Sequence, residues 1–222
     1  MLTNRPLGLA RVVLAGLLIW PLASFAPGRS EVGPPQPVGE IRAAALQDGD
    51  IIFRRGRDLM AASVLAADGA ARFSHVGLIL RADENEGEGA LVIHAVPGED
   101  GGAGGVIAEP LADFLAPEAA ADHAIYRPRA LTPGQQARLR SVALGQVGRP
   151  FDYDLRLSDP GAVYCSELVL RAFAEAGAGL DEGLREVDTV MMAEPAIAPD
   201  SLRASPLLAN ITARVTQPVI SR

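Results

Sequence analysis

The side chains that could perform nucleophilic catalysis in this chain are a single cysteine, Cys165, and three histidines, His75, His94 and His123. A thiol attacks a carbonyl carbon as its thiolate, and at an ordinary pKa only a small fraction is ionised at neutral pH. It therefore needs a base, and histidine is the usual one at that pH. This set of residues permits acyl transfer if the fold brings a histidine to the cysteine.

Cys165 stands at the predicted start of a helix. Apolar residues follow it at intervals of three and four and share one face, and Gly177 ends the pattern. The face consists of Cys165, Leu168, Val169, Ala172, Phe173 and Ala176. The first turn of a helix offers free backbone N–H groups and a positive dipole end, which lower a thiol pKa toward neutrality and can bind an oxyanion. An inert core thiol is the alternative, because free cysteine is often buried.

Two of the histidines lie on apolar runs that predict an antiparallel pair of strands. His75 opens "SHVGLIL" (74–80) and His94 lies within "ALVIHAV" (90–96), with a polar, glycine-containing connection between the runs. One face of such a pair can present both imidazoles to the cysteine helix, one as base and one to orient it. His123 stands in the polar stretch "EAAADH", and each histidine taken alone is more often a structural residue than a catalytic one.

The other patterns predict an α+β domain. Thr132, Pro133 and Gln135 form a capping box that starts a helix, and Gly148 ends it. Further helices are expected over 39–46 and 58–66, and further strands over 51–53, near Val106 and over 124–127.

The N-terminus has the features of a secretory signal. Arg5 and Arg11 precede an apolar run over 12–26, which contains Pro21 and ends in small residues. We expect a signal peptide over 1–26, a flexible linker over 27–39 rich in proline and glycine, and one domain over 40–222. The expected location is periplasmic or secreted from a bacterium. A membrane tether is the alternative if the signal stays uncleaved.

Composition excludes several functional classes. The 20 basic residues less Arg5 and Arg11 leave 18 against 27 acidic residues, a net charge of −9, which disfavours nucleic acid as a partner. One cysteine rules out a disulfide framework within the chain, and no H-x-x-x-H or C-x-x-C motif suggests a metal. We expect no cofactor and no obligate protein partner.

Four segments resemble, in order, the motifs of the YiiX-like group of circularly permuted NlpC-type, papain-fold cysteine hydrolases. They are "GDIIFRR", "FSHVGLIL", "LVIHAV" and "GRPFDYDLRLSDPGAVYCSELVLRAF", with a weaker similarity at "IAPDSLRASPLL". The order, histidine before cysteine, is that of the permuted fold. The resemblance implies an antiparallel sheet packed on the cysteine helix, with Cys165 as nucleophile, His75 as base and the polar residue of "LVIHAV" as the orienting group.

At that third position the group usually has glutamate, whereas this chain has His94. The related lecithin:retinol acyltransferase-like proteins are similar in pairing two histidines with a later cysteine. A neutral histidine supports imidazolium less than a carboxylate does, which leaves open whether full activity is kept.

The expected function is an exported thiol hydrolase that cleaves an amide or ester of a cell-envelope peptide or lipid through Cys165, His75 and His94. Tyr164 is a candidate oxyanion or substrate-binding residue, with a packed aromatic as the alternative. A lipid acyltransferase, a non-catalytic binding module and a zinc site of Cys165, His75 and His94 remain alternatives.

Overall fold

The fold is built around one antiparallel sheet of six strands in the order β4-β3-β2-β1-β5-β8. The computed structural model describes residues 40–82, 89–98, 103–188 and 194–216. The strands are β1 (Asp50–Gly56), β2 (His75–Arg81), β3 (Ala90–Val96), β4 (Gly105–Pro110), β5 (Ala120–Pro128) and β8 (Leu208–Asn210). The expected signal peptide over 1–26 and linker over 27–39 lie outside the described residues.

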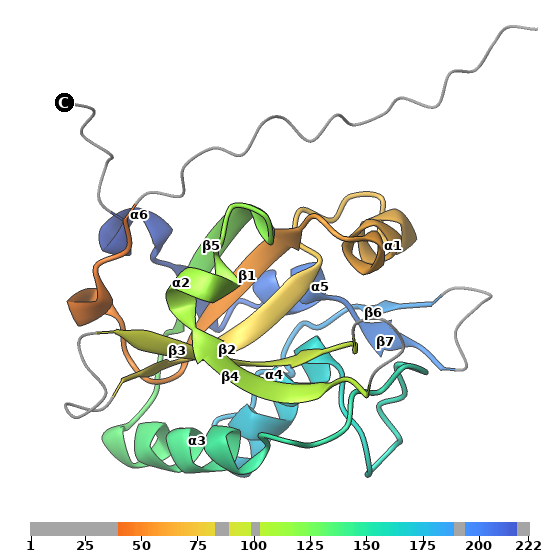
Figure 1. Ribbon diagram of the computed structural model, residues 1–222. Helices are drawn as coiled ribbons and strands as arrows, with labels where there is room; N and C mark the ends of the chain where they lie inside the picture. Colours follow the sequence, from red (N-terminus) through yellow and green to blue (C-terminus); the bar gives the residue numbers. More distant parts are fainter. Residues whose placement is uncertain (1–39, 83–88, 99–102, 189–193, 217–222) are drawn as a thin grey trace, which may run out of the picture. The chain divides into compact units, whose positions relative to one another are not determined.

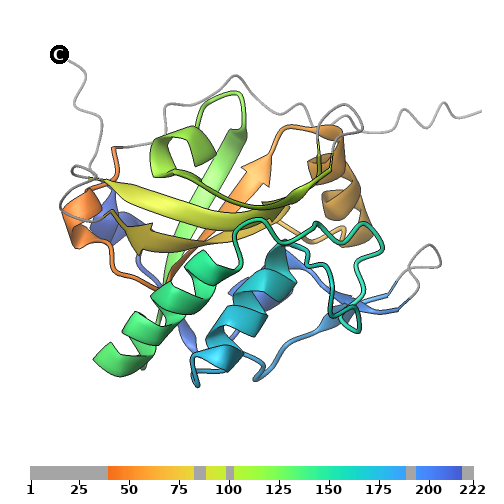
Figure 2. The same cartoon turned by 60° about the horizontal axis from the view of Figure 1, so that its bottom comes forward.

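Helices cover both faces of the sheet (Figures 1 and 2). On one face, α3 (Pro133–Gly145) and α4 (Cys165–Glu175) pack through the larger apolar core. On the other face, the smaller core is closed by the 3-10 turn η1 (Ala43–Ala45), α2 (Leu111–Phe114) and α6 (Thr212–Val215). Burial on both faces explains why "GLIL" of β2 reads as a continuous apolar run rather than an alternating one.

The predicted elements that carry the chemistry are confirmed. β2 and β3 pair antiparallel, with Leu78 opposite Ile93. Helix α4 begins at Cys165, and Gly177 follows its end with a φ of 75°, a conformation that favours glycine. At α3, the Thr132 hydroxyl accepts the Gln135 N–H at 3.2 Å while the Gln135 side chain accepts the Thr132 N–H at 3.0 Å.

Two expected helices differ in extent from the prediction. In the described part of the segment expected over 39–46, residues 40–46 hold only the three-residue η1, because a short alanine run lacks the length to sustain a helix. The helix expected over 58–66 is α1 (Leu59–Ala67), which Asp58 caps by accepting the Ala61 N–H at 2.7 Å. Within the described residues, no helix combines the length and apolar character needed to cross a membrane.

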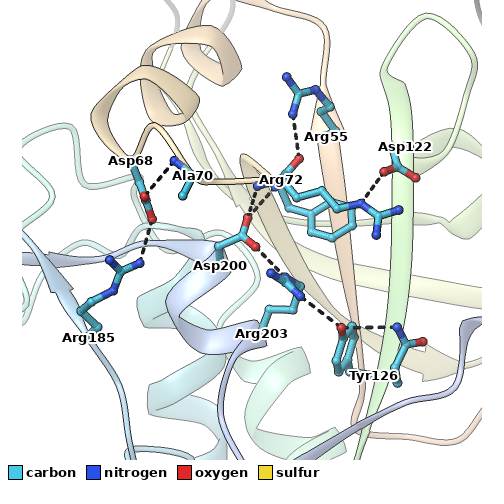
Figure 3. Close-up of polar contacts among 11 residues, drawn as sticks. Arg55, Asp68, Ala70, Arg72, Asp122, Tyr126, Arg185, Asp200 and Arg203 are labelled. Carbon is cyan, nitrogen blue, oxygen red and sulfur yellow. Dashed lines mark hydrogen bonds and ion pairs between the residues drawn. The ribbon is translucent and has the colours of Figure 1, made fainter.

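The C-terminal part of the chain holds the segment that leads into β2. Beyond α4 come β6 (Glu186–Val187), β7 (Ala196–Ile197) and α5 (Pro199–Arg203). The buried Asp200 of α5 accepts the backbone N–H groups of Arg72 and Phe73 at 2.8 and 2.6 Å, and Arg203 at 2.5 Å (Figure 3). Since His75 follows Phe73 by two residues, Asp200 fixes the approach of the chain to the start of β2.

We predict that Asp200→Asn destabilises the protein by about 2 to 3 kcal/mol, because it removes the charge that accepts two N–H groups and an arginine. Denaturant unfolding monitored by circular dichroism measures this change. The matched control is Asp122→Asn, which loses the exposed ion pair with Arg72 at 2.7 Å but keeps an oxygen that can accept the His123 N–H, and it should cost less than about 1 kcal/mol. Equal losses in the two variants would contradict a special role of Asp200.

Candidate active site

The thiol of Cys165 lies in the first turn of α4, beside the start of β2. Its side chain is half-buried and lines a pocket together with Ser74 and His75. Burial raises the pKa of the Cys165 thiol, while hydrogen bonds from Ser166 and from the backbone N–H of Val76 act in the opposite direction. The expectation that the helix start lowers this pKa toward neutrality is therefore wrong for the resting protein, because desolvation outweighs the N–H groups.

His75 and His94 meet as the paired strands predicted. Nε2 of His75 lies 2.8 Å from Nδ1 of His94, and the ring planes are close to perpendicular. Gly77 makes this contact possible: a Cβ at Gly77 would stand 2.5 Å from Val92 and 3.1 Å from the Cβ of His94. The glycine of "SHVG" therefore lets β2 and β3 approach closely where the two imidazoles face each other.

A carboxylate extends this line of side chains by one member. Nε2 of His94 lies 2.8 Å from Oε1 of Glu109, and Glu109 belongs to β4, the neighbour of β3. His94 pairs with Ile107 across the two strands, so Glu109 is its diagonal neighbour two residues along. Glu109 is not among the candidate site residues predicted from the sequence. Its signal is an acidic residue in an apolar strand, which becomes informative only once the register of β3 and β4 is known.

The ring of Phe114, from α2, covers this group of side chains. It stacks on His75 at a centroid distance of 5.8 Å, meets His94 edge-on at 5.0 Å, and lies under the guanidinium of Arg54 at 4.4 Å. Burial under this cover lowers the pKa of His75 well below 6.5, and His94 and Arg54 lower it further. Burial also lowers the pKa of His94, although the contact with Glu109 opposes that shift. Both imidazoles are therefore neutral at pH 7.

The ionised carboxylate of Glu109 determines which ring nitrogens of His94 and His75 carry a proton. Contact with His94 lowers the pKa of Glu109, so its carboxylate is ionised and can only accept hydrogen bonds. Nε2 of His94 lies 2.8 Å from this carboxylate, at ion-pair distance but not aligned as a hydrogen bond. A proton on Nε2 of a neutral His94 places a donor on the side of the carboxylate and leaves Nδ1 to accept. His75 in turn donates through Nε2, which leaves the lone pair of its Nδ1 to accept a proton. This is the tautomer that a base for a thiol requires.

The pocket beside Cys165 is small and apolar. Its volume is about 90 Å³, and its walls include Met60, Val64, Phe151 and Leu155. Tyr164 also lines this pocket, but it is buried and its hydroxyl accepts the N–H of Ile197 at 3.0 Å. Tyr164 is thus placed as a wall of the pocket, and its role in oxyanion or substrate binding stays a prediction.

The third histidine and the zinc alternative do not join this arrangement. His123 lies on β5, opposite Arg54 of β1, and contacts neither imidazole. Nε2 of His75 and Nδ1 of His94 face each other at 2.8 Å, which leaves no space for an ion between them. No group of three histidine, cysteine or acidic side chains suited to a metal occurs in the part of the chain that the structure describes.

We predict that Glu109→Gln lowers kcat by about 10- to 100-fold with little change in KM, because the amide can also donate and no longer fixes the tautomers of His94 and His75. Steady-state kinetics with a thiol-hydrolase substrate measures this effect. Glu109→Gln should add little to the loss caused by His94→Ala, because both act through His75. Additive losses would show that Glu109 acts elsewhere.

The comparisons with known proteins agree with this geometry. Residues 45–211 match the family model of the permuted papain-like amidase enzymes YaeF/YiiX, family C92. Among solved structures, the crystal structure of metalloprotein YiiX from Escherichia coli O157:H7 is similar, with 24% identity and a TM-score of 0.59, over 74% of this chain and 95% of that one. The comparison with curated proteins gave no match. The matched region is well over half of the chain and holds all the residues of the site. The chain therefore belongs to the permuted papain-like amidase family and is a cysteine hydrolase of α+β fold.

Proposed function

We propose that this protein hydrolyses an amide bond through an acyl-enzyme on Cys165, with His75 as base, His94 as the residue that orients it, and Glu109 as the acceptor that fixes both tautomers. The observation that carries the proposal is the unbroken line of contacts from His75 through His94 to Glu109, 2.8 Å at each step, beside a half-buried thiol. An ester is a second substrate for the same chemistry, since its carbonyl is attacked in the same way.

The proposed reaction begins with Cys165 as a neutral thiol and His75 as a neutral imidazole. The thiol proton passes to Nδ1 of His75 as the sulfur attacks the carbonyl carbon, and backbone N–H groups at the start of α4 stabilise the oxyanion. The carbon–nitrogen bond then breaks, and the amine leaves with the proton from His75. Water, deprotonated by His75, attacks the thioester, releasing the carboxylic acid and restoring the thiol. An acyl acceptor in place of water would make the same protein an acyltransferase.

The His94–Glu109 pair supports the charge that forms on His75. In the sequence, His94 in place of the usual glutamate suggested weaker support for imidazolium. Glu109 supplies a carboxylate on the far side of His94 from His75, with its Oε1 2.8 Å from Nε2 of His94. The pair therefore takes the place of a single glutamate, with histidine as the intermediate.

The substrate we propose is an envelope peptide or lipid whose acyl side is apolar. The pocket next to Cys165 has a volume of about 90 Å³ and apolar walls, so it suits a short aliphatic group. The apolar N-terminal run with its two preceding arginines supports an exported protein that meets such substrates in the bacterial envelope.

We predict that Cys165→Ser abolishes turnover while lowering stability by no more than about 1 to 2 kcal/mol, because an alcohol is far less ionised than a thiol but nearly the same size. Activity-based profiling of envelope extracts with the native and Cys165→Ser proteins, alongside thermal melts, measures both effects. A folded Cys165→Ser protein with full turnover would exclude Cys165 as nucleophile.

A second prediction concerns pH. His75 accepts a proton only while it is neutral, and burial holds its pKa well below 6.5, so kcat/KM should stay level down to about pH 6.5 and fall only under more acidic conditions. Because the pKa of Cys165 is raised, iodoacetamide should alkylate it at pH 6 more slowly than it alkylates a free thiol. Faster alkylation than a free thiol would indicate a resting thiolate–imidazolium pair instead of a neutral one.

A further inference from the structure

Arg54, on β1, is a largely buried arginine without a carboxylate partner. Its side chain donates to the carbonyl oxygen of Phe114 at 2.9 Å and lies over the Phe114 ring, but within the described residues it forms no ion pair. Its Nε is buried and has no hydrogen-bond partner there. Burial lowers the pKa of Arg54, and the nearby charges of Glu109 and Asp58 oppose this shift. A buried charge of this kind is costly unless an anion compensates it.

A cavity of about 740 Å³ lies at this arginine. Arg54 and Asp58 are the charged residues among its described walls. Asp58 is already engaged as the cap of α1, where it accepts the Ala61 N–H at 2.7 Å. The guanidinium is therefore the cationic group of this cavity, and among the described residues it forms no ion pair.

The cavity adjoins the apolar pocket of the active site. Both are lined by Met60, Ser74, His75 and Pro97, while Cys165 and Tyr164 line only the apolar pocket and Arg54 lines only the larger cavity. His75 thus stands between the two spaces. In the proposed reaction the acyl group stays on Cys165 and the leaving amine takes its proton from His75. The acyl group accordingly belongs in the apolar pocket and the amine in the cavity at Arg54.

We propose that Arg54 binds the carboxylate of an amino acid that leaves as the amine, so that the substrate is an N-acyl amino acid with a short apolar acyl group. This inference rests on the proposed amidase function. A guanidinium matches a carboxylate geometrically and gives strong, charge-assisted hydrogen bonds. The carboxylate compensates the buried charge of Arg54 when substrate is bound, and a neutral leaving group leaves that charge uncompensated.

The competing explanation is that Arg54 only balances the charge of Glu109. Arg54 lies near enough to contribute to the lowered pKa of Glu109, after the larger effect of His94. In that case, replacing Arg54 alters catalysis equally for every substrate. A comparison of two substrates that differ only in the charge of the leaving group separates the two explanations.

The experiment measures hexanoate release from N-hexanoyl-alanine and from N-hexanoyl-alaninamide by mass spectrometry. For the native protein, we expect kcat/KM to favour the carboxylate substrate. In Arg54→Gln, the ratio of the two kcat/KM values should fall by about 10- to 100-fold, which is the loss expected for hydrogen bonds to a charged group. The ratio cancels any general damage to the catalytic residues. Arg54→Lys, which keeps the charge, should retain part of the preference.

The matched control is Arg55→Gln. Arg55 is the next residue of β1 and does not line the cavity at Arg54. Its guanidinium donates at 3.1 Å to the carbonyl oxygen of Arg72 (Figure 3). Successive side chains of a strand point to opposite faces, so Arg55→Gln should keep the native ratio. An unchanged ratio in a folded Arg54→Gln protein would overturn the carboxylate site and leave Arg54 as a countercharge of Glu109.

Binding without turnover tests the same site separately from the reaction. Calorimetry with Cys165→Ala should show tighter binding of N-hexanoyl-alanine than of the amide, and this preference should be lost in Cys165→Ala/Arg54→Gln. Selective binding without turnover by the native protein would support the carboxylate site and contradict the amidase function for this substrate. Turnover without any selectivity would support the amidase function and overturn the carboxylate site.

Discussion

The chemistry of the site depends on one constraint: an ionised carboxylate can accept hydrogen bonds but cannot donate them. Oε1 of Glu109 lies 2.8 Å from Nε2 of His94, and Nδ1 of His94 lies 2.8 Å from Nε2 of His75. Because the carboxylate of Glu109 only accepts, the favoured tautomers carry the proton of each imidazole on the nitrogen nearer Glu109 and leave a lone pair on the other nitrogen. Glu109, acting through His94, thus keeps the proton of His75 on Nε2 and leaves a lone pair on Nδ1. A donor in place of Glu109 would allow the opposite set of tautomers and a His75 unable to take the thiol proton.

The fold supplies the distances that this constraint needs. Three adjacent strands of the sheet contribute one member each, and the register of β3 and β4 places Glu109 diagonally from His94. Gly77 allows β2 and β3 to approach closely, and the Phe114 ring packs against both imidazoles. Asp200 holds the segment before His75 from the C-terminal part of the chain (Figure 3). The segment around α5 thus has a physical connection to the base, although it contributes no reacting group.

Much of this arrangement could be predicted from the sequence, because its signals are local. The capping box of α3, the apolar face behind Cys165 and the two runs that became β2 and β3 are each contained in a short stretch. The order of histidine before cysteine added the resemblance to the permuted family. Glu109 and Arg54 could not be found in this way, because their roles depend on strand register and burial. The thiol pKa was predicted in the wrong direction for the same reason: the dipole is visible in the sequence, whereas desolvation appears only in the fold.

The most direct test of the account is the tautomeric state of the histidines, measured by ¹⁵N NMR of the resting protein at pH 7. We predict that His75 and His94 are both neutral, each with its proton on Nε2, and that Glu109→Gln releases this restriction. A His75 with its proton on Nδ1, or a charged His75 in the resting protein, would contradict the central claim. In either case the line from Glu109 could not prepare His75 to accept the proton of Cys165.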